Sequence, residues 1–217
     1  MSYIYFPSCK LTAYLSESSK KIQEYLREKY EMNITGCCRP NHKKLTEQDT
    51  AVYICNTCAA FIREDVPQAK AISVWEFLAE DDEFPWRDYH GEKMAVQDCW
   101  RVYDNRTQQD VIRKILKRMN IEIVEIENNF EKADFCGTSL LEVLPPQNGE
   151  FAPIRFIENA RGKFIPHSKE DQEKIMKEYC TQFTTDKVVC YCTACVQGAK
   201  LGGVKGIHLL DLMMNAN

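Results

Sequence analysis

Most of the chain's eleven cysteines fall into two groups that repeat one order, and thiols grouped in this way bind metals or carry out redox chemistry. The first group is Cys9, the adjacent pair Cys37 and Cys38, and the C-x-x-C of Cys55 and Cys58. The second group is Cys99, Cys136, and the C-x-x-C of Cys192 and Cys195. A single C-x-x-C is a weak signal, but the repetition of the whole order is a strong one.

Thiolate is a soft ligand that suits zinc and iron–sulfur clusters. A C-x-x-C at the start of a helix can place two sulfurs on one metal, and the helix N-terminus favours the thiolate form. The side chains of the adjacent pair Cys37 and Cys38 diverge, so these sulfurs cannot easily share one tetrahedral ion but could bind different irons of an opened cluster. Five thiols also exceed the four that zinc or a cubane cluster takes. The alternative is a zinc site with four thiolates and one spare thiol.

Composition favours the metal interpretation over disulfides. Eleven cysteines in 217 residues would predict disulfides in a small secreted protein, but the count is odd and the N-terminus shows no signal peptide. The chain is 44% hydrophobic, which is enough for a core without cross-links. We therefore expect a cytoplasmic protein whose cysteines hold a metal or cluster. A redox dithiol and plain buried cysteines are the alternatives.

Charge and motifs exclude several other classes. The net charge of −4 argues against a general binder of nucleic acid or of membrane surfaces. No apolar run approaches the ~20 residues that a membrane span needs. The sequence contains no G-x-G-x-x-G, P-loop or G-x-S-x-G motif, so nucleotide-binding and serine-hydrolase functions have no support.

Short β-prone runs precede the cysteines, and helical patterns separate these runs. The expected strands are 3–6, 32–35, 51–54, 71–74, 93–97, 121–126 and 188–189. The expected helices are 12–30, 59–63, 75–78, one N-capped by Thr107, and 168–183. Strands that alternate with helices predict an α/β fold of βαβ units with mostly parallel sheets. Because ligands gather at the carboxyl ends of parallel strands, we expect a Cys-rich site at one edge of each sheet.

The repeated order predicts two halves. An acidic, turn-rich stretch at 80–92 marks the boundary, so we assign 1–85 to a first half with a five-thiol site and 86–217 to a second half with a four-thiol site. Residues 138–167 are rich in Pro and Gly and show little periodicity, so we interpret them as an insertion in the second half.

Both groups resemble the CCG family, the cysteine-rich domain found in heterodisulfide reductase, which has relatives in the iron–sulfur subunits of glycolate and lactate oxidases. The family pattern is a Cys, a Cys-Cys pair often followed by Gly, and a C-x-x-C, usually in two copies. The first group matches in full, whereas Phe135-Cys136-Gly137 stands where the second copy of the family has Cys-Cys-Gly. Residues 116–137 and 207–212 also resemble the family, so the resemblance covers nearly the whole chain.

This resemblance implies an iron–sulfur oxidoreductase. The first group would hold a non-cubane [4Fe-4S] cluster that reductively splits a small-molecule disulfide or oxidises a thiol. The second group would hold a second [4Fe-4S] cluster or zinc, because Phe135 replaces one thiol, with Cys190 as a substitute ligand to consider. The chain lacks a ferredoxin-type cysteine run, so electrons would come from a partner iron–sulfur or flavin protein. The alternative from another class is a zinc-binding structural or interaction module without catalysis.

A basic stretch directly follows the Cys pair and contains the candidate catalytic residues. Arg39 and Lys43 could bind an anionic thiol substrate through charge-assisted hydrogen bonds. His42 could protonate a departing thiolate, because its unperturbed pKa lies near neutrality. The alternative interpretation is a solvated loop, which is what charge runs usually form.

Overall fold

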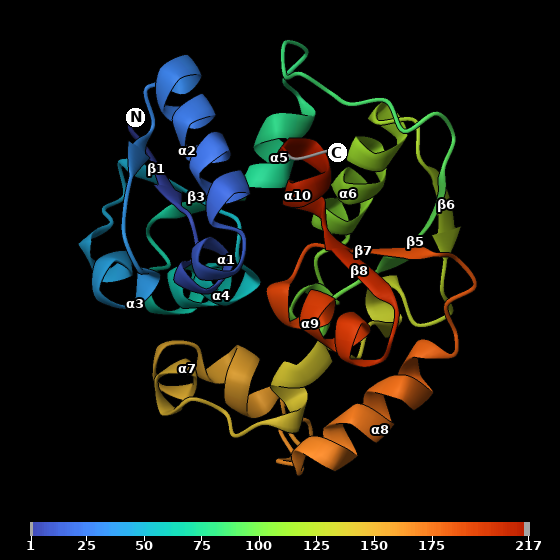
Figure 1. Ribbon diagram of the computed structural model, residues 1–217. Coiled ribbons are helices and arrows are strands. Elements are labelled where there is room, and N and C mark those ends of the chain that lie inside the picture. Colours follow the sequence, from blue (N-terminus) through green and yellow to red (C-terminus); the bar gives the residue numbers. More distant parts are fainter. Residues whose placement is uncertain (1, 215–217) are drawn as a thin grey trace. The chain divides into compact units, whose positions relative to one another are not determined.

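A computed structural model describes residues 2–214 and divides into two compact units, each built on a four-stranded, all-parallel sheet (Figure 1). Unit 1 contains Met1–Asp81 and Pro145–Arg161, and unit 2 contains Asp82–Leu144 and Gly162–Asn217. The expected α/β fold with two repeated halves and parallel sheets is confirmed.

The sheet of unit 1 has the strand order β2-β1-β3-β4. Its strands are β1 (Ser2–Phe6), β2 (Asn33–Ile34), β3 (Asp49–Tyr53) and β4 (Lys70–Ser73). The central strands β1 and β3 pair in register with Phe6 opposite Tyr53, so their carboxyl ends lie side by side. Both of these side chains are buried, which is typical of a parallel sheet covered on both faces.

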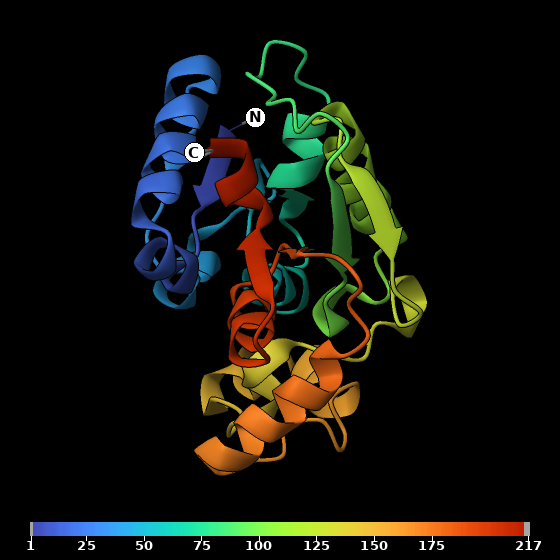
Figure 2. The same ribbon diagram turned by 45° about the vertical axis from the view of Figure 1, so that its right-hand side comes forward.

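The sheet of unit 2 repeats this topology with the order β6-β5-β7-β8. Its strands are β5 (Lys93–Gln97), β6 (Glu122–Glu125), β7 (Lys187–Cys190) and β8 (Lys205–His208). β5 pairs with β6 along one edge, and these two strands lie side by side in Figure 2. Along its other edge β5 pairs with β7, and Gln97 lies opposite Cys190. The carboxyl ends of the central strands therefore meet in unit 2 as they do in unit 1.

Helices connect the strands and cover the sheets. Those of unit 1 are α1 (Cys9–Tyr14), α2 (Ser16–Tyr30), α3 (Cys38–Asn41), η1 (His42–Lys44), α4 (Asn56–Asp65), α5 (Val74–Ala79), α7 (Pro146–Phe151) and the π-helical turn η5 (Ile154–Glu158). Those of unit 2 are η2 (Trp100–Val102), α6 (Arg106–Arg118), η3 (Phe130–Lys132), η4 (Gly137–Leu141), α8 (Lys169–Cys180), α9 (Thr193–Leu201) and α10 (Leu209–Met214). The single helix expected at 12–30 is two helices, α1 and α2.

The N-terminus of α6 differs from the prediction. The Asn105 side chain accepts a hydrogen bond from the backbone N–H of Gln108 at 3.1 Å, so Asn105 caps this helix and Thr107 lies in its first turn. Asparagine is among the best N-cap residues because its short side chain reaches the exposed amides of the first turn. The helix expected from residue 168 is α8, and Ser168 is its N-cap, since its side chain accepts from the backbone N–H of Asp171.

The assignment of the insertion also changes. The whole of 138–167 was expected in the second half, whereas residues 145–161 pack within unit 1. Phe151 and Phe156 of this segment are buried, and their rings lie 5.3 and 6.2 Å from that of Phe61 on α4. The Glu64 carboxylate accepts hydrogen bonds from the backbone N–H groups of residues 154 and 155 at 2.7 and 2.9 Å. This apolar and polar anchoring on α4 explains the membership of unit 1.

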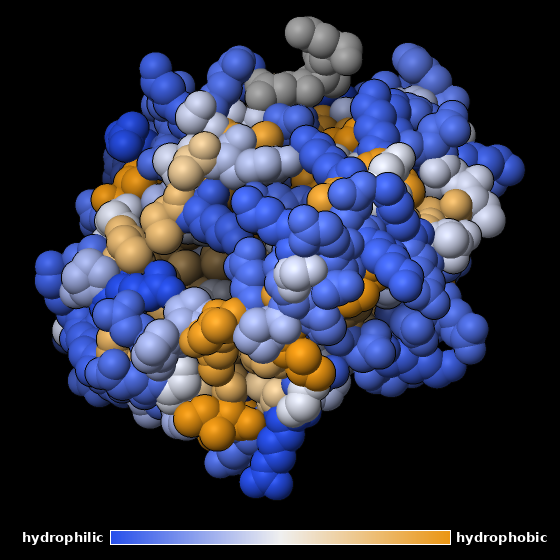
Figure 3. Space-filling model, turned by 60° about the horizontal axis from the view of Figure 1, so that its bottom comes forward, coloured by the Kyte–Doolittle hydropathy of each residue, from blue (hydrophilic) through white to orange (hydrophobic). Residues whose placement is uncertain are grey.

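The face drawn in Figure 3 is mainly hydrophilic, with separate apolar areas. Within the segment 145–161, Ile154 and Ile157 are 52% and 55% exposed, while Phe151 and Phe156 face inwards.

Among residues 2–214, no helix combines the length and apolarity required to cross a membrane.

Candidate metal centre

The two units place cysteines at equivalent points of their sheets. Cys9 and Cys55 follow the central strands β1 and β3, and Cys99 and Cys192 follow β5 and β7. In each unit the C-x-x-C opens a helix, because Cys55 is the N-cap of α4 and Cys192 is the N-cap of α9. The second cysteine of each motif, Cys58 or Cys195, lies in the first helical turn.

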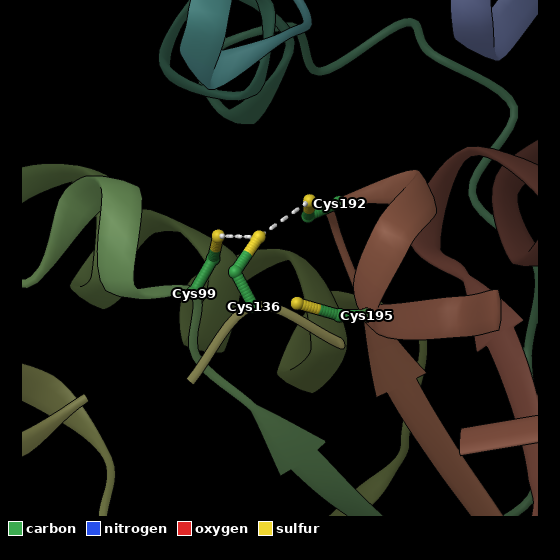
Figure 4. Close-up of side chains that lie close together, drawn as sticks. All are labelled: Cys99, Cys136, Cys192 and Cys195. Atoms are coloured by element: carbon green, nitrogen blue, oxygen red, sulfur yellow. Dashed lines mark hydrogen bonds between the residues drawn. The ribbon is translucent and has the colours of Figure 1, made fainter. Parts of the chain in front are cut away.

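In unit 2, four thiols converge to form one group, which we call the four-thiol centre (Figure 4). Its members are Cys99, Cys136, Cys192 and Cys195. All four Sγ atoms lie within 4.8 Å of one another, with 3.2 Å between those of Cys99 and Cys136 and 3.5 Å between those of Cys136 and Cys192. No disulfide links the cysteines of the described chain. Four soft donors at these separations could hold a metal ion or a metal cluster.

A glycine allows the close approach of two of these ligands. Gly137 follows Cys136 and has φ +52°, and a Cβ at this position would lie 1.8 Å from the backbone oxygen of Ala194. Ala194 precedes Cys195 in the first turn of α9. Only glycine therefore permits the loop with Cys136 to press against the helix with Cys195.

Hydrogen bonds distribute the charge among the four thiols. Hydrogen bonds with Cys136, Cys195 and Cys99 lower the pKa of the Cys192 thiol well below its usual value. The pKa of Cys195 is raised by its hydrogen bonds with Cys136 and Cys192, and burial raises that of Cys99. Cys192 is therefore the member of this group that most readily takes the thiolate form, with neighbouring thiols as its hydrogen-bond donors. A metal cation would take the place of the thiol protons.

A buried arginine also contacts the four-thiol centre. Arg101 of η2 is only 9% exposed, and its Nη1 donates to the Sγ of Cys136 and lies 3.9 Å from the Sγ of Cys192. Its Nη2 donates to the Ser139 hydroxyl at 3.2 Å, and that hydroxyl donates to the backbone oxygen of Cys136 at 2.9 Å. Arg101 was not predicted from the sequence, although its position two residues after Cys99 is a usable signal.

A second buried network fixes the strand ends that carry the ligands. Asp98 is fully buried and accepts hydrogen bonds from Tyr191 Oη at 2.7 Å and from Arg113 Nη1 at 2.6 Å. Its other oxygen accepts from the backbone N–H of Phe130 at 2.8 Å. Asp98 and Tyr191 directly precede Cys99 and Cys192, so their hydrogen bond joins the two backbone segments that carry these thiols. This network was not predicted from the sequence either.

Two expectations about neighbouring residues can be compared with the structure. Phe135, which takes the place of a family thiol, stacks on Tyr179 with 3.9 Å between ring centroids. The Phe135 side chain therefore forms an aromatic pair with Tyr179. Cys190 is buried on β7 opposite His208 and is not a member of the four-thiol centre. Its proposed role as a substitute ligand has no support from this arrangement.

The thiols of unit 1 lie in a more open environment. Cys9 is exposed, Cys37 and Cys55 are partly exposed, and Cys38 and Cys58 are buried. The Sγ of Cys37 donates to that of Cys9 at 3.8 Å. Hydrogen bonds with Cys38 and Cys55 raise the pKa of Cys58 well above its usual value, and the hydrogen bond with Cys58 lowers the pKa of Cys38. The structure thus brings Cys9 to Cys37, and Cys58 to Cys38 and Cys55.

His42 is fully buried and both of its ring nitrogens have partners. Its Nδ1 lies 2.8 Å from the backbone oxygen of Cys38, and its Nε2 lies 2.7 Å from Oδ2 of Asp65. The ring packs between Phe61 and Phe151, with centroids at 5.9 and 4.9 Å. These contacts give His42 a positioning role for the Cys pair, and its role in proton transfer stays a prediction.

The other two candidate catalytic residues differ in their exposure. Arg39 is partly buried, and its Nη2 donates to Asn148 Oδ1 at 3.1 Å while the guanidinium lies over the Phe61 ring. The Lys43 side chain is 59% exposed and forms an ion pair with Asp65 at 3.3 Å. Both cations therefore already have partners in unit 1, and their role in substrate binding stays a prediction.

A buried hydroxyl near the unit 1 thiols lacks a partner. Tyr5 of β1 is fully buried, and among the described residues its Oη has no hydrogen-bond partner. Burial, and then the charge of Cys58, raise the pKa of Tyr5. An unsatisfied buried hydroxyl costs about 1–3 kcal/mol, so this is an unusual position for a tyrosine unless another group accepts a hydrogen bond from it.

No protein-family model matches the chain, and no curated protein matches it significantly.

Proposed function

We propose that this chain is an iron–sulfur oxidoreductase of the heterodisulfide-reductase type that acts on a thiol/disulfide couple. In this proposal, Cys9, Cys37, Cys38, Cys55 and Cys58 hold a non-cubane [4Fe-4S] cluster, and the four-thiol centre holds a second metal group. The observation that carries the proposal is the equivalent placement of the C-x-x-C motifs in two sheets of identical strand order, combined with a fifth, solvent-accessible thiol in unit 1. The motif resemblance to the CCG family supports it.

Exposure assigns different roles to the two sites. Cys9 is exposed and two further thiols of unit 1 are partly exposed, so a substrate can reach them from solvent. In the four-thiol centre, Cys99 and Cys136 are fully buried, Cys195 is 3% exposed, and only Cys192 is partly exposed. The site in unit 1 is therefore the reactive one, and the four-thiol centre serves electron storage or stability.

The proposed reaction converts a disulfide, two electrons and two protons into two thiols. The cluster, when bound, would relay the electrons and offer an iron to the substrate sulfur, and the two protons would come from solvent. The chain's own residues hold the reactants: Lys43, at the surface of η1, attracts an anionic group of the substrate, and His42 holds the backbone of the Cys pair in place. The electrons come from a partner iron–sulfur or flavin protein, and a cytoplasmic setting would keep the thiols reduced.

A second function, a zinc-binding structural module without catalysis, is favoured by the spacing within the four-thiol centre. With Zn–S bonds of about 2.3 Å, the sulfurs of a tetrahedral site lie roughly 3.8 Å apart. The separations of 3.2 and 3.5 Å and the limit of 4.8 Å for all pairs of these sulfurs bracket this value. Zinc in the four-thiol centre is compatible with an iron–sulfur cluster in unit 1.

Metal and sulfide analysis after anaerobic purification tests the proposal. We expect a brown protein with about four irons and inorganic sulfide at the unit 1 thiols, with zinc or further iron at the four-thiol centre. A colourless protein that contains zinc alone would refute the iron–sulfur oxidoreductase and establish the zinc module.

A further inference from the structure

Arg101 is an unexpected residue to find beside four thiols in the interior of unit 2. A buried guanidinium is costly unless its charge is compensated and its N–H groups are satisfied. The two donors described above go to sulfur atoms and to the Ser139 hydroxyl. A neutral thiol is a weak acceptor, whereas a thiolate is a strong one, so this arrangement is stabilising when the sulfurs are negatively charged.

We propose that Arg101 is a positioning residue that retains the metal of the four-thiol centre by offsetting its negative charge and donating hydrogen bonds to Cys136 and Cys192. This inference rests on the metal-binding part of the proposed function. Four thiolates around a dication leave an excess of two negative charges, and the guanidinium compensates one of them. Donation to a ligand sulfur also fixes the orientation of that ligand, as other outer contacts of metal sites do.

Ser139 completes the arrangement. Its hydroxyl accepts from Arg101 Nη2 and donates to the backbone oxygen of Cys136, so the same serine fixes the guanidinium and the ligand loop. The planar fork of arginine suits this geometry, because one nitrogen reaches sulfur while the other reaches the hydroxyl. Lysine would supply the charge without the fork.

The test measures the rate at which anaerobically purified full-length protein loses its metal to a chelator such as EDTA. Arg101→Gln removes the charge, Arg101→Lys keeps it, and Arg106→Gln is the matched control, because Arg106 is 62% exposed on α6 and pairs with Asp110. We expect Arg101→Gln to lose metal about 10- to 100-fold faster, as for other outer-contact substitutions. Arg101→Lys should fall between this variant and wild type, and the control should match wild type.

Alkylation with N-ethylmaleimide, mapped by mass spectrometry, locates the effect. Faster labelling of Cys136 and Cys192 in Arg101→Gln supports the proposal, and wild-type rates of metal loss and labelling in that variant overturn it. If Arg101→Gln does not fold, Ser139→Ala decides in the same assays: faster metal loss supports the proposal and an unchanged rate overturns it. Wild-type protein without metal at these four thiols would instead refute the metal-binding function on which the inference rests.

Discussion

Tyr191 donates a hydrogen bond to Asp98 at 2.7 Å, and this contact joins the residue before Cys192 to the residue before Cys99. Both partners are buried, so the bond is not weakened by water. Because each partner directly precedes a ligand, the geometry of the four-thiol centre depends on a contact that lies outside it.

Replacing Tyr191 with Phe should therefore destabilise unit 2 by about 1–3 kcal/mol, the usual cost of leaving a buried acceptor short of one donor. Urea denaturation of the metal-free protein measures this difference. Tyr3→Phe is the control, since Tyr3 lies 37% exposed on β1 in unit 1. Equal losses in the two variants would show that the Asp98 contact has no special role.

The two cysteine groups should respond differently to substitution. Cys37→Ser or Cys38→Ser should abolish the spectroscopic signal of the unusual cluster, because these thiols belong to unit 1, whereas Cys99→Ser should leave that signal largely intact. Electron paramagnetic resonance of reduced and oxidised samples, with iron analysis, makes the comparison. The reverse pattern would move the unusual cluster to the four-thiol centre.

His42 and Lys43 are adjacent, but their environments predict different phenotypes. His42→Ala should lower the stability of unit 1 by about 2–4 kcal/mol and reduce its iron content, because the substitution leaves a cavity and frees the backbone oxygen of Cys38. Lys43→Ala should keep the iron and raise KM for an anionic disulfide with little change in kcat. Iron analysis and steady-state kinetics check both. Normal iron content with a pH-dependent loss of kcat in His42→Ala would instead support proton transfer by this residue.

Tyr5 offers a test that compares loaded and metal-free protein. Tyr5→Phe removes a hydroxyl without a partner among the described residues, so the metal-free variant should be as stable as wild type or up to about 1 kcal/mol more stable. If the hydroxyl donates to a bound cluster, the loaded variant should lose iron faster than wild type. Thermal unfolding of both forms and chelator-driven iron loss measure this. Identical behaviour of variant and wild type in the loaded form would show that the phenol does not contact the cluster.

Glu125 predicts an acid-dependent contribution to stability. Burial alone would raise its pKa, but the hydrogen bonds and charge of Arg113 outweigh burial and lower the pKa below the ordinary value. A lowered pKa stabilises the folded state above the unfolded pKa of about 4.3, and this stabilisation is lost as the pH falls through the folded value. The advantage of wild type over Glu125→Gln should therefore be full at pH 7 and shrink below about pH 4. Denaturation of metal-free wild type and Glu125→Gln at both pH values gives the result, with substitution of the exposed Glu127 by Gln as the control. A stability difference between wild type and Glu125→Gln that is the same at both pH values would contradict the assignment.

The sequence predicted the repeated strands and the cysteine positions because both depend on local patterns. The run before Cys9 and the run before Cys55 are short and apolar, and parallel pairing brings their ends together. Arg101 could not be assigned in this way, since its contact with Cys136 spans 35 positions and depends on the loop around Gly137. The cap at Asn105 was missed because Thr107 is also a good cap residue and lies only two positions away.

The docking of residues 145–161 was also beyond sequence reasoning. Glu64 binds backbone groups about 90 positions further along the chain, and residues 138–167 show little periodicity that could reveal this contact. Aromatic residues in a loop rich in Pro and Gly are compatible with either unit. The packing of Phe151 against Phe61 and His42, together with the Glu64 hydrogen bonds, determines the choice.

This docking makes unit 1 a discontinuous folding unit, which has a consequence for biosynthesis. During translation, Phe61 and His42 emerge from the ribosome long before Phe151 and Phe156, so the nascent first unit exposes apolar surface until most of the chain has been made. Loading of metal at its thiols should therefore be post-translational, after the later segment has docked. A fragment that ends at the boundary of the first half would lack this segment and should aggregate.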